Sequence, residues 1–467
     1  MSDLELDDIQ GLVARGYGRL RAARFFALTF GDPAAARSWL AQVSGEVTPA
    51  SSDPHDSAVH LALSAPGLEA LGLPGETLAG FSLEFREGMT TEHRQRVLGD
   101  FGRDDPGGWR WGGPDNAVAH ALLMLYAPDE SALLSLVGRH QERLDTAGIA
   151  GAATLGTQDI GDVEPFGFRD GISQPVLDGF GRDGREADTL EPGEFVLGYE
   201  NEYGLLTDSP TVAEASDPRK LLPRGQKDGT GDFGRNGTYL VVRQLEQDVA
   251  GFWKYLDSLA TSREERDRLA AKMVGRWPGG APLVLSPGQD DPALEKANDF
   301  AYHESDPHGM ACPVASHIRR SNPRDSLDPD PGTDDSVEVN KRHRILRRGR
   351  SYGPRMTVEQ ALAGPDGLER GLHFVCLAGN IARQFEFIQH TWANNPKFAG
   401  LYDEVDPITG PRDESGATFS MPDTPVRRRI TGIPAFVTVR GGGYFFLPGI
   451  RALRYLAAVS EGGGGAG

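Results

Sequence analysis

The chain has 467 residues, and its 48 lysines and arginines against 67 aspartates and glutamates give a formal net charge of −19. A hydrophobic content of 39% can fill folded cores, which excludes a globally disordered chain. The acidic balance argues against a nucleic-acid-binding protein, because phosphate binding needs a dense cationic surface. No apolar run reaches the ~18 residues of a membrane-spanning helix, so we expect no membrane segment.

Two further features bear on compartment and metal binding. Residues 1–8 are acidic, whereas a secretory leader is basic and then apolar, so a cytoplasmic location is predicted. The two cysteines, Cys312 and Cys376, are isolated from each other. This count excludes a disulfide framework and argues against a structural zinc site.

Four segments share one pattern: a β-type apolar run, a short polar break, and then a helical period. Asp32 followed by Pro33 is a strong helix start, and Asp129 is a second capping residue. In chain order, the predicted strands and helices are 24–30 with 34–43, 120–126 with 129–144, 238–243 with 246–259, and 372–377 with 380–392. Extra strands are expected at 58–63, 435–439 and 444–447.

The spacing of these units predicts the fold class. Two units precede residue 150 and two follow residue 230, which indicates an α+β protein with two similar domains, residues 1–230 and 231–467. Each domain is expected to be an antiparallel sheet with helices packed on it. The alternative is that the likeness is accidental, because strand–helix pairs are common. Residues 151–232 and 278–337 fit neither pattern, and loops of that length are usually functional or disordered.

The first candidate site is the run FGFRDGISQP at 166–175. Its glycines bracket Arg169 and Asp170, so the backbone can turn tightly and present Asp170 to a cavity. Such a carboxylate could relay protons, bind a metal, cap a helix or pair with Arg169. Spacing alone favours the structural roles.

The second candidate is CPVASHIRRSNPR at 312–324, where one imidazole, His317, precedes three guanidiniums. A lone histidine is more often a core or surface residue than a ligand, and the arginines favour an anionic partner. Haem would satisfy both demands, because its iron takes an axial imidazole and its two propionates take cations. A third cluster, HRILRRGRSYGP at 343–354, is equally consistent with a solvated basic surface.

Together, the clusters closely resemble the dye-decolourising peroxidase family, haem enzymes that use hydrogen peroxide. The resemblance spans most of residues 8–456 in order, and it implies two ferredoxin-like α+β domains with haem held mainly by the C-terminal one. Besides the three clusters, it rests on PGEFVLGYENEYG at 192–204, NGTYLVVRQLEQDVAGFW at 236–253, GLHFVCLAGNIARQFEFIQHTWANNP at 371–396 and FVTVRGGGYFFLPG at 436–449.

The resemblance implies roles for individual residues. His317 matches the proximal histidine that ligates the haem iron, whereas its competitor His308 lacks the arginine two positions later. Asp170 matches the distal aspartate that carries protons. Arg347 matches the distal arginine that stabilises charge, and it is preferred to Arg348 because it directly follows the aliphatic pair.

The remaining site residues are also implied by the resemblance. Arg324 resembles a propionate partner, with Arg319 a second candidate. Asp406 resembles the acidic residue that accepts the proximal imidazole N–H. Leu372 and Phe374 resemble apolar residues on the peroxide side of the haem.

The implied enzyme is a peroxidase with one haem b per chain, reducing hydrogen peroxide and oxidising dyes, phenols and other aromatic reductants. Because dyes are too large for a closed haem pocket, Trp392 and Tyr352 are candidates for relaying electrons, although aromatic core packing explains them equally well. The alternative function is a haem-binding protein for iron or haem handling with incidental peroxidase activity, in which Asp170 and Arg347 are dispensable. The sequence leaves the oligomeric state open.

Overall fold

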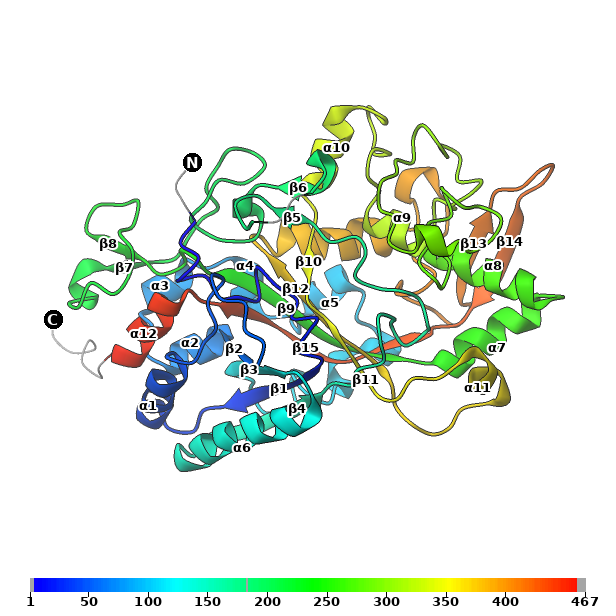
Figure 1. Cartoon of the computed structure of the whole chain (residues 1–467). Helices are drawn as coiled ribbons and strands as arrows, with labels where there is room; N and C mark the ends of the chain where they lie inside the picture. The colour runs from blue at the N-terminus through cyan, green and yellow to red at the C-terminus, as the bar shows by residue number, and fades with distance from the viewer. Residues whose placement is uncertain (1–3, 182–183, 460–467) are drawn as a thin grey trace.

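The computed structural model describes residues 4–181 and 184–459. Within these residues, one antiparallel sheet runs through the molecule in the order β10-β12-β9-β15-β2-β3-β1-β4, and β11 also pairs with β12 (Figure 1). Its strands are β1 (Ala22–Thr29), β2 (Ala58–Leu63), β3 (Ala121–Ala127), β4 (Ala150–Gly156), β9 (Thr238–Gln247), β10 (Leu346–Arg347), β11 (Arg350–Tyr352), β12 (Gly371–Ala378) and β15 (Val437–Leu447).

The sheet consists of two halves with the same strand–helix order. In the first half β1, α1 and β2 are followed by β3, α6 and β4; in the second β9 and α7 are followed by β10, β11, β12, a π-helical segment and β15. The middle strands are β3 and β1 in the first half and β12 and β9 in the second, so the predicted pair of ferredoxin-like α+β domains is confirmed. The helices are α1 (Pro33–Val43), α6 (Glu130–Thr146), α7 (Val249–Leu259) and the π-helical turns Ala382–Glu386 and Ile388–Ala393.

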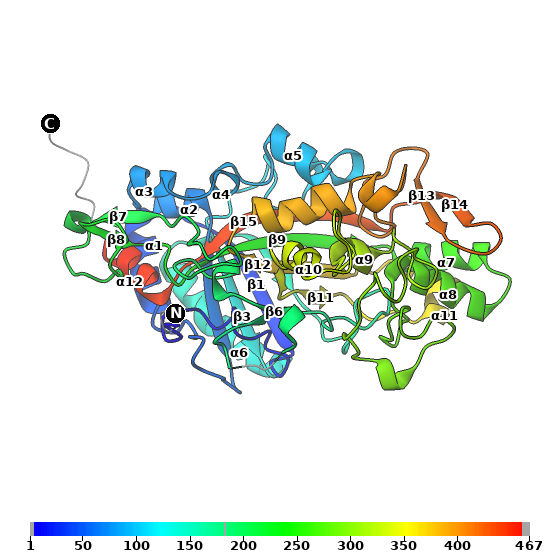
Figure 2. The ribbon, with the colours of Figure 1, turned by 90° about the horizontal axis from the view of Figure 1, so that it is seen from above.

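The two halves are joined edge to edge. Phe446 of β15 lies opposite Leu63 of β2, which makes the two sheets continuous. The last helix, α12 (Ile450–Ala458), returns to pack against α1 of the first half, far from α7 and α8 (Arg263–Val274), as Figures 1 and 2 show. The boundary at residue 230 therefore stays a prediction, because the end of the chain packs on its beginning.

Local sequence explains why the first half folds as expected. The Asp32 side chain accepts a hydrogen bond from the Ala34 N–H, and Asp129 accepts one from the Ala132 N–H, so both predicted helix starts are capped. Every residue of β3 is buried, because hydrophobic clusters cover both faces of the sheet. Trp39 of α1 belongs to the cluster on one face.

Three elements differ from expectation. The strands expected at 435–439 and 444–447 form the single strand β15, which begins at Val437. Its ladder shifts register between Val439 and Gly441, where an added Cβ would lie 2.5 Å from the Trp111 ring. The helix after β12 is π-helical, with the Glu386 N–H donating to the Ile381 carbonyl at 3.0 Å. Strand β4 lies in a segment expected to be irregular, because this edge strand is mostly exposed and lacks apolar alternation.

The remaining short elements surround this frame. Residues 151–232 and 278–337 are largely irregular beyond β4, as predicted, and both contribute to the cavity described below. No helix in the described part of the chain is long and apolar enough to cross a membrane. The short helices and strands around the main sheet are α2 (Ala65–Ala70), α3 (Gly75–Ala79), α4 (Leu83–Glu87), α5 (Glu92–Leu98), α9 (His317–Ser321), α10 (Asp334–Lys341), α11 (Val358–Ala363), β5 (Val176–Leu177), β6 (Thr189–Leu190), β7 (Thr211–Ala213), β8 (Thr230–Asp232), β13 (Ala417–Met421) and β14 (Arg428–Ile433).

Candidate active site

A large cavity lies between the sheet of the second half and the helices that cover it. Strands β9, β12 and β15 supply part of its wall, and α9 and the π-helical segment supply another part. Most lining residues follow residue 231, and the turn containing residues 164–173 reaches in from the first half. The cavity is therefore built mainly, but not entirely, by the second half of the chain.

Asp170 and Arg347 meet in the wall of this cavity. Arg347, the last residue of β10, donates a 2.9 Å hydrogen bond from its guanidinium to the Asp170 carboxylate. The same carboxylate oxygen accepts the Gly171 N–H at 2.6 Å, and Gly171 has the positive φ of 78° that this turn requires. Burial raises the pKa of Asp170, but Arg347 and the Gly171 N–H together hold it below its ordinary value. Asp170 is therefore an ionised carboxylate beside a permanent cation.

His317 borders the same cavity and is fixed from behind. It is the first residue of α9, and its Nδ1 lies 2.8 Å from an oxygen of the fully buried Asp406. The other Asp406 oxygen accepts the N–H groups of Ile408 and Thr409, at 2.8 and 2.9 Å. These contacts assign the proton to Nδ1 of His317 and leave Nε2 as the nitrogen with a free lone pair.

The pKa values of this pair reflect the same arrangement. Burial raises the pKa of Asp406, but the adjacent His317 imidazole and the N–H donors outweigh it and lower the value to about 2. Burial lowers the pKa of His317, and the Asp406 carboxylate more than compensates, so the net shift is upward. Asp406 is thus a stable anion that strengthens the imidazole as an electron donor.

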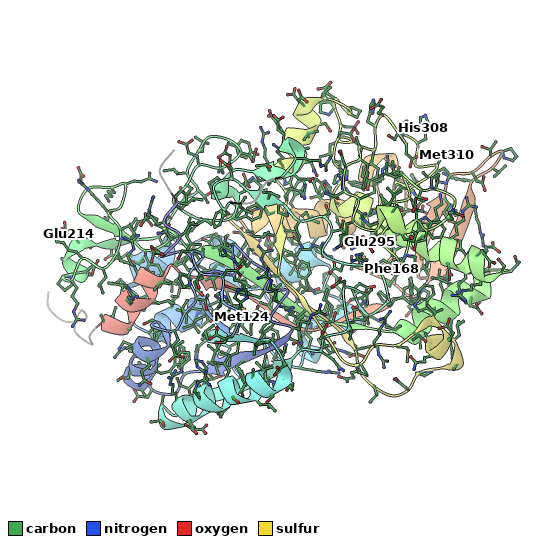
Figure 3. All side chains as sticks on the ribbon, in the orientation of Figure 1. Met124, Phe168, Glu214, Glu295, His308 and Met310 are labelled. Carbon is green, nitrogen blue, oxygen red and sulfur yellow. The ribbon has the colours of Figure 1, made fainter. Side chains whose placement is uncertain are left out.

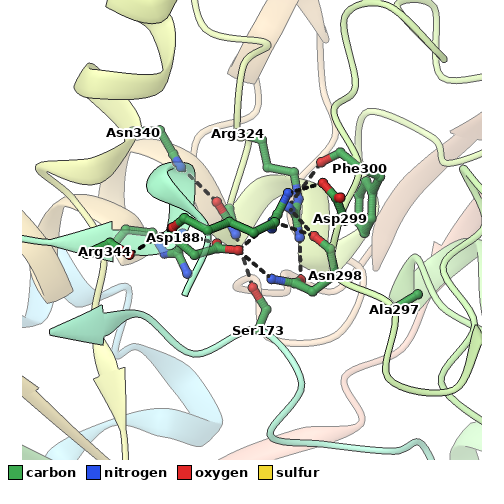
Figure 4. A network of polar contacts seen from close by, with 12 residues as sticks. Ser173, Asp188, Ala297, Asn298, Asp299, Phe300, Arg324, Asn340 and Arg344 are labelled. Carbon is green, nitrogen blue, oxygen red and sulfur yellow. Dashed lines mark hydrogen bonds and ion pairs between the residues drawn. The ribbon is translucent and has the colours of Figure 1, made fainter. Parts of the chain in front are cut away.

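One part of the cavity wall carries an excess of positive charge. Arg276, Arg324 and Arg344 all line it, and burial lowers the pKa of all three, to about 10 for Arg276 and Arg344. Arg324 donates to the backbone and side-chain oxygens of Asn298 (Figure 4). Neither Arg276 nor Arg324 forms an ion pair with any described carboxylate, and Arg344 pairs with Asp188, which Arg185 also contacts. Such a cluster suits a ligand that brings its own anionic groups.

The chemistry of these groups fits haem. Buried Nη2 of Arg344 has no hydrogen-bond partner among the described residues, as expected of a group awaiting an anion such as a propionate. No group of three His, Cys, Asp or Glu side chains in residues 4–181 and 184–459 could hold a metal ion. The imidazole of His317 is a side chain that haem iron takes as a protein ligand, so His317 would hold the group in this cavity and the iron would supply the redox chemistry. Leu372 and Phe374 give the cavity wall apolar surface.

Comparison with known proteins supports the same conclusion. No protein-family model matches the chain. A dye-decolorizing peroxidase of Exidia glandulosa is 31% identical over 492 residues, covering 97% of this chain and 87% of that protein. The multifunctional dye peroxidase DyP2 of an Amycolatopsis strain is 30% identical over 484 residues, covering 97% and 96%.

The chain belongs to the dye-decolorizing peroxidase family. It is accordingly a haem peroxidase, an oxidoreductase that uses hydrogen peroxide, and the resemblance drawn from its motifs is confirmed. The crystal structure of a fungal peroxidase of this type from Auricularia auricula-judae matches with a TM-score of 0.80 and 27% identity, covering 98% of this chain and 100% of that one. A shorter match, 28% identical over 186 residues and 40% of this chain, is a deferrochelatase of Yersinia pestis.

The structure of this peroxidase separates the candidate arginines and histidines. Arg319 is buried away from the cavity wall, donating to the carbonyls of Asp306 and Cys312 at 3.0 and 2.8 Å. The geometry thus brings Arg324 into the site and leaves Arg319 outside it. His308 is exposed at the edge of the molecule and does not line the cavity (Figure 3). The Arg348 guanidinium binds backbone carbonyls of the N-terminal segment.

The two relay candidates are both buried. The Trp392 side chain is 4% exposed, and its ring packs edge-on against His343 and Phe387 at centroid distances of 5.3 and 5.4 Å. Tyr352 is 8% exposed and stacks on His373 at 4.6 Å. Neither ring offers a large dye direct contact.

Glu164, Arg276 and Arg344 are among the cavity residues that were not predicted from the sequence. Arg344 lies in a basic cluster that the sequence already singled out, three positions before Arg347. Arg276 follows a helix, and Glu164 precedes the FGFRDG run, with no pattern that marks either. Their positions become apparent only once the loops are folded over the sheet.

Proposed function

We propose that Asp170 is the proton carrier of this peroxidase, that Arg347 stabilises negative charge on the peroxide, and that His317 ligates the iron of one haem b per chain. Three observations support these roles. Asp170 and Arg347 are hydrogen-bonded in the wall of the cavity that His317 also lines. Asp406 orients the His317 ring, and Arg324 belongs to the cationic cluster suited to propionates.

The bound haem supplies the redox-active iron at which peroxide is reduced. Because Asp170 is ionised at neutral pH, its carboxylate can accept the proton of the inner peroxide oxygen and return it to the outer one, which leaves as water. The contribution of Arg347 is the fixed positive charge of its guanidinium beside the reacting oxygens. Leu372 and Phe374 place apolar surface in the same cavity, which limits competing water.

Aromatic reductants, including dyes and phenols, are the proposed electron donors. Electron relay by Trp392 draws support from its position, because Ile388 and Ala393 of the same π-helical turn line the cavity. Tyr352 lies in β11, next to the cavity strand β12. Both rings also pack in hydrophobic clusters or on neighbouring rings, so substitution must distinguish the two roles. The cytoplasmic location rests on the acidic first residues alone and stays a prediction.

The observation that carries the proposal is the Asp170–Arg347 pair in the His317 cavity. The test is the visible spectrum of the haem-loaded protein before and after one equivalent of peroxide. We expect a rapid spectral change in the wild type and a loss of at least about 100-fold in its rate in Asp170→Asn. Asp162→Asn, the same charge change in the same loop, is the matched control.

The second candidate function, haem or iron handling, is supported by the shorter match to a deferrochelatase. It predicts a different result. If Asp170 has no role in the function of the protein, Asp170→Asn and the wild type react with peroxide at the same rate. Release of iron from bound haem is then measurable in both proteins. Equal peroxide rates in Asp170→Asn and Asp162→Asn would therefore contradict the proposed function.

A further inference from the structure

Glu164 sits inside the turn that carries Asp170. Its two carboxylate oxygens accept the backbone N–H groups of Phe168 and Phe166, each at 3.0 Å. Its own backbone also closes the turn: the Glu164 N–H donates to the Phe168 carbonyl at 2.9 Å, and the Gly167 N–H donates to the Glu164 carbonyl at 2.8 Å. One side chain thus binds both arms of the turn that leads into Asp170.

The same carboxylate connects the turn to the sheet. The Gln247 side-chain amide, at the end of β9, donates to Glu164 at 2.8 Å. Both residues border the cavity. Glu164 is therefore the point at which a loop of the first half of the chain is hydrogen-bonded to the strand at the centre of the second half.

Neighbouring contacts fix the outside of the turn. The Trp253 indole donates to the Phe166 carbonyl at 3.0 Å, and the Phe168 ring lies parallel to that indole. Arg169 points away to Glu295 at 2.9 Å, and Figure 3 shows Phe168 and Glu295 in this region. These contacts hold one backbone carbonyl and two side chains of the turn, whereas the Glu164 carboxylate holds its backbone N–H groups.

We propose that Glu164 is a positioning residue of this peroxidase, whose carboxylate keeps the turn in the conformation in which Asp170 reaches Arg347. The inference rests on the proposed role of Asp170. A carboxylate suits the task because it only accepts hydrogen bonds and here meets three N–H donors. Hydrogen bonds to an ionised acceptor are also about twice as strong as neutral ones. A glutamine has a single acceptor oxygen and would present its own N–H groups to the same donors.

The charges around Glu164 make this support sensitive to pH. Burial, together with the negative charge of Asp170, raises the pKa of Glu164 to about 7 against the lowering effect of Gln247 and the two backbone N–H groups. Arg169 gives little compensation, because it is paired with Glu295 and approaches Asp162. Protonation turns one acceptor oxygen into a donor, so the turn should loosen as the pH falls through about 7.

The experiment measures amide hydrogen exchange of Phe166 and Phe168 in the haem-loaded full chain, together with the rate of the peroxide reaction. In Glu164→Gln and Glu164→Ala we expect protection of these amides to fall about tenfold, the equivalent of one lost hydrogen bond, and the peroxide rate to fall with it. Glu295→Gln is the control, because it releases Arg169 from the same turn without touching either N–H. In the wild type, protection should decrease below about pH 7, and in Glu164→Gln it should not depend on pH.

The outcomes are separable from those of the proposed function. Unchanged protection in Glu164→Gln, or an equal loss in Glu295→Gln, would overturn the positioning role even if Asp170→Asn is inactive. Lost protection with an unchanged peroxide rate would also overturn it, because the turn would then not matter for Asp170. If Glu164→Ala fails to fold, the isosteric Glu164→Gln still decides between these results. A fully active Asp170→Asn would instead refute the proposed function on which the inference rests.

Discussion

Arg347 donates a 2.9 Å hydrogen bond to Asp170 although 177 positions separate the two residues in the chain. Asp170 lies in a turn of the irregular segment after β4, and Arg347 ends the short strand β10 of the second sheet. The two catalytic candidates therefore come from different halves of the protein. Their contact depends on how the long loop folds over the cavity, so the site is a product of the tertiary structure.

The pH dependence of the peroxide reaction should report this contact. Because Arg347 holds the pKa of Asp170 below its ordinary value of about 3.9, Asp170 stays ionised, and able to accept a proton, down to about that pH. We expect the acid limb of the pH–rate profile, where protonation of Asp170 slows the reaction, to lie below pH ~4 in the wild type. In Arg347→Leu, whose Asp170 lacks a cation, this limb should move to higher pH. Stopped-flow rates measured between about pH 3 and about pH 8 test this shift.

A decrease in the peroxide rate near neutral pH would come from protonation of Glu164, and we expect it to be absent from Glu164→Gln. If Arg347→Leu shows the same acid limb as the wild type, the guanidinium does not control the Asp170 proton, and the assigned electrostatic role of Arg347 is wrong.

Replacing Asp406 should destabilise the protein even without haem. Asp406→Asn leaves the His317 N–H and two backbone N–H groups competing for a single amide oxygen, which costs about 1–3 kcal/mol for an unsatisfied buried group. Because the folded-state pKa of Asp406 is depressed to about 2, its contribution is present above the unfolded value near ~3.9 and is lost as the pH falls through about 2.

Urea denaturation of the haem-free protein at neutral and acid pH measures this difference. Asp403→Asn, which removes a surface partner of Arg429, is the control and should change stability by less than about 0.5 kcal/mol. An Asp406→Asn protein as stable as the control at neutral pH would show that the His317–Asp406 contact contributes nothing to folding.

The cationic cluster predicts how haem is held. Arg324→Met and Arg344→Met should each weaken haem binding by about tenfold or more, because each removes a charge-assisted contact available to a propionate. Haem dimethyl ester, which lacks the carboxylates, should bind the wild type more weakly and lose little further affinity in either variant. Quenching of tryptophan fluorescence during titration measures both affinities.

Arg319→Met separates the two arginine candidates. Its guanidinium contacts Asp306 and Cys312 away from the cavity wall, so the variant should lose stability while its folded fraction binds haem normally. Weakened haem binding in Arg319→Met with intact binding in Arg324→Met would reverse the assignment.

The relay role of Trp392 predicts a difference between substrates. In Trp392→Phe, which preserves ring packing against His343 and Phe387, turnover of a bulky dye should fall at least about tenfold while a small phenol is oxidised normally. Steady-state rates with both substrates test this, and Tyr352→Phe is the parallel variant. Equal loss with both substrates would assign Trp392 to packing rather than to electron transfer.

Strong local patterns explain which elements could be predicted. The strand 58–63 follows from an almost continuous apolar run, and the capped starts of α1 and α6 follow from Asp side chains at helix N-termini. Strand β4 could not be found this way, because an exposed edge strand has no buried face to impose alternation. The three glycines at 441–443 suggest that a strand ends there. The strand continues, because the Trp111 ring occupies the space in which a side chain of residue 441 would lie.

The site also has features that the sequence indicates and features that only the fold shows. His317, Asp170 and Arg347 lie in recognisable motifs, whereas Asp406 lies in none of them, and no spacing rule places Asp406 behind His317 or Asp170 beside Arg347. The choice between Arg319, within α9, and Arg324, after it, depends on the direction of each side chain. The sequence does not indicate Glu164, because two of its three donors are backbone N–H groups, which leave no trace in residue identities.

The most direct test of the account is a crystal structure of the haem-loaded protein. The account predicts that Nε2 of His317 is the protein ligand of the iron and that Asp170 and Arg347 lie together on the opposite face of the ring. A porphyrin whose iron is held by another side chain, or one with Asp170 on the same face as His317, would contradict it.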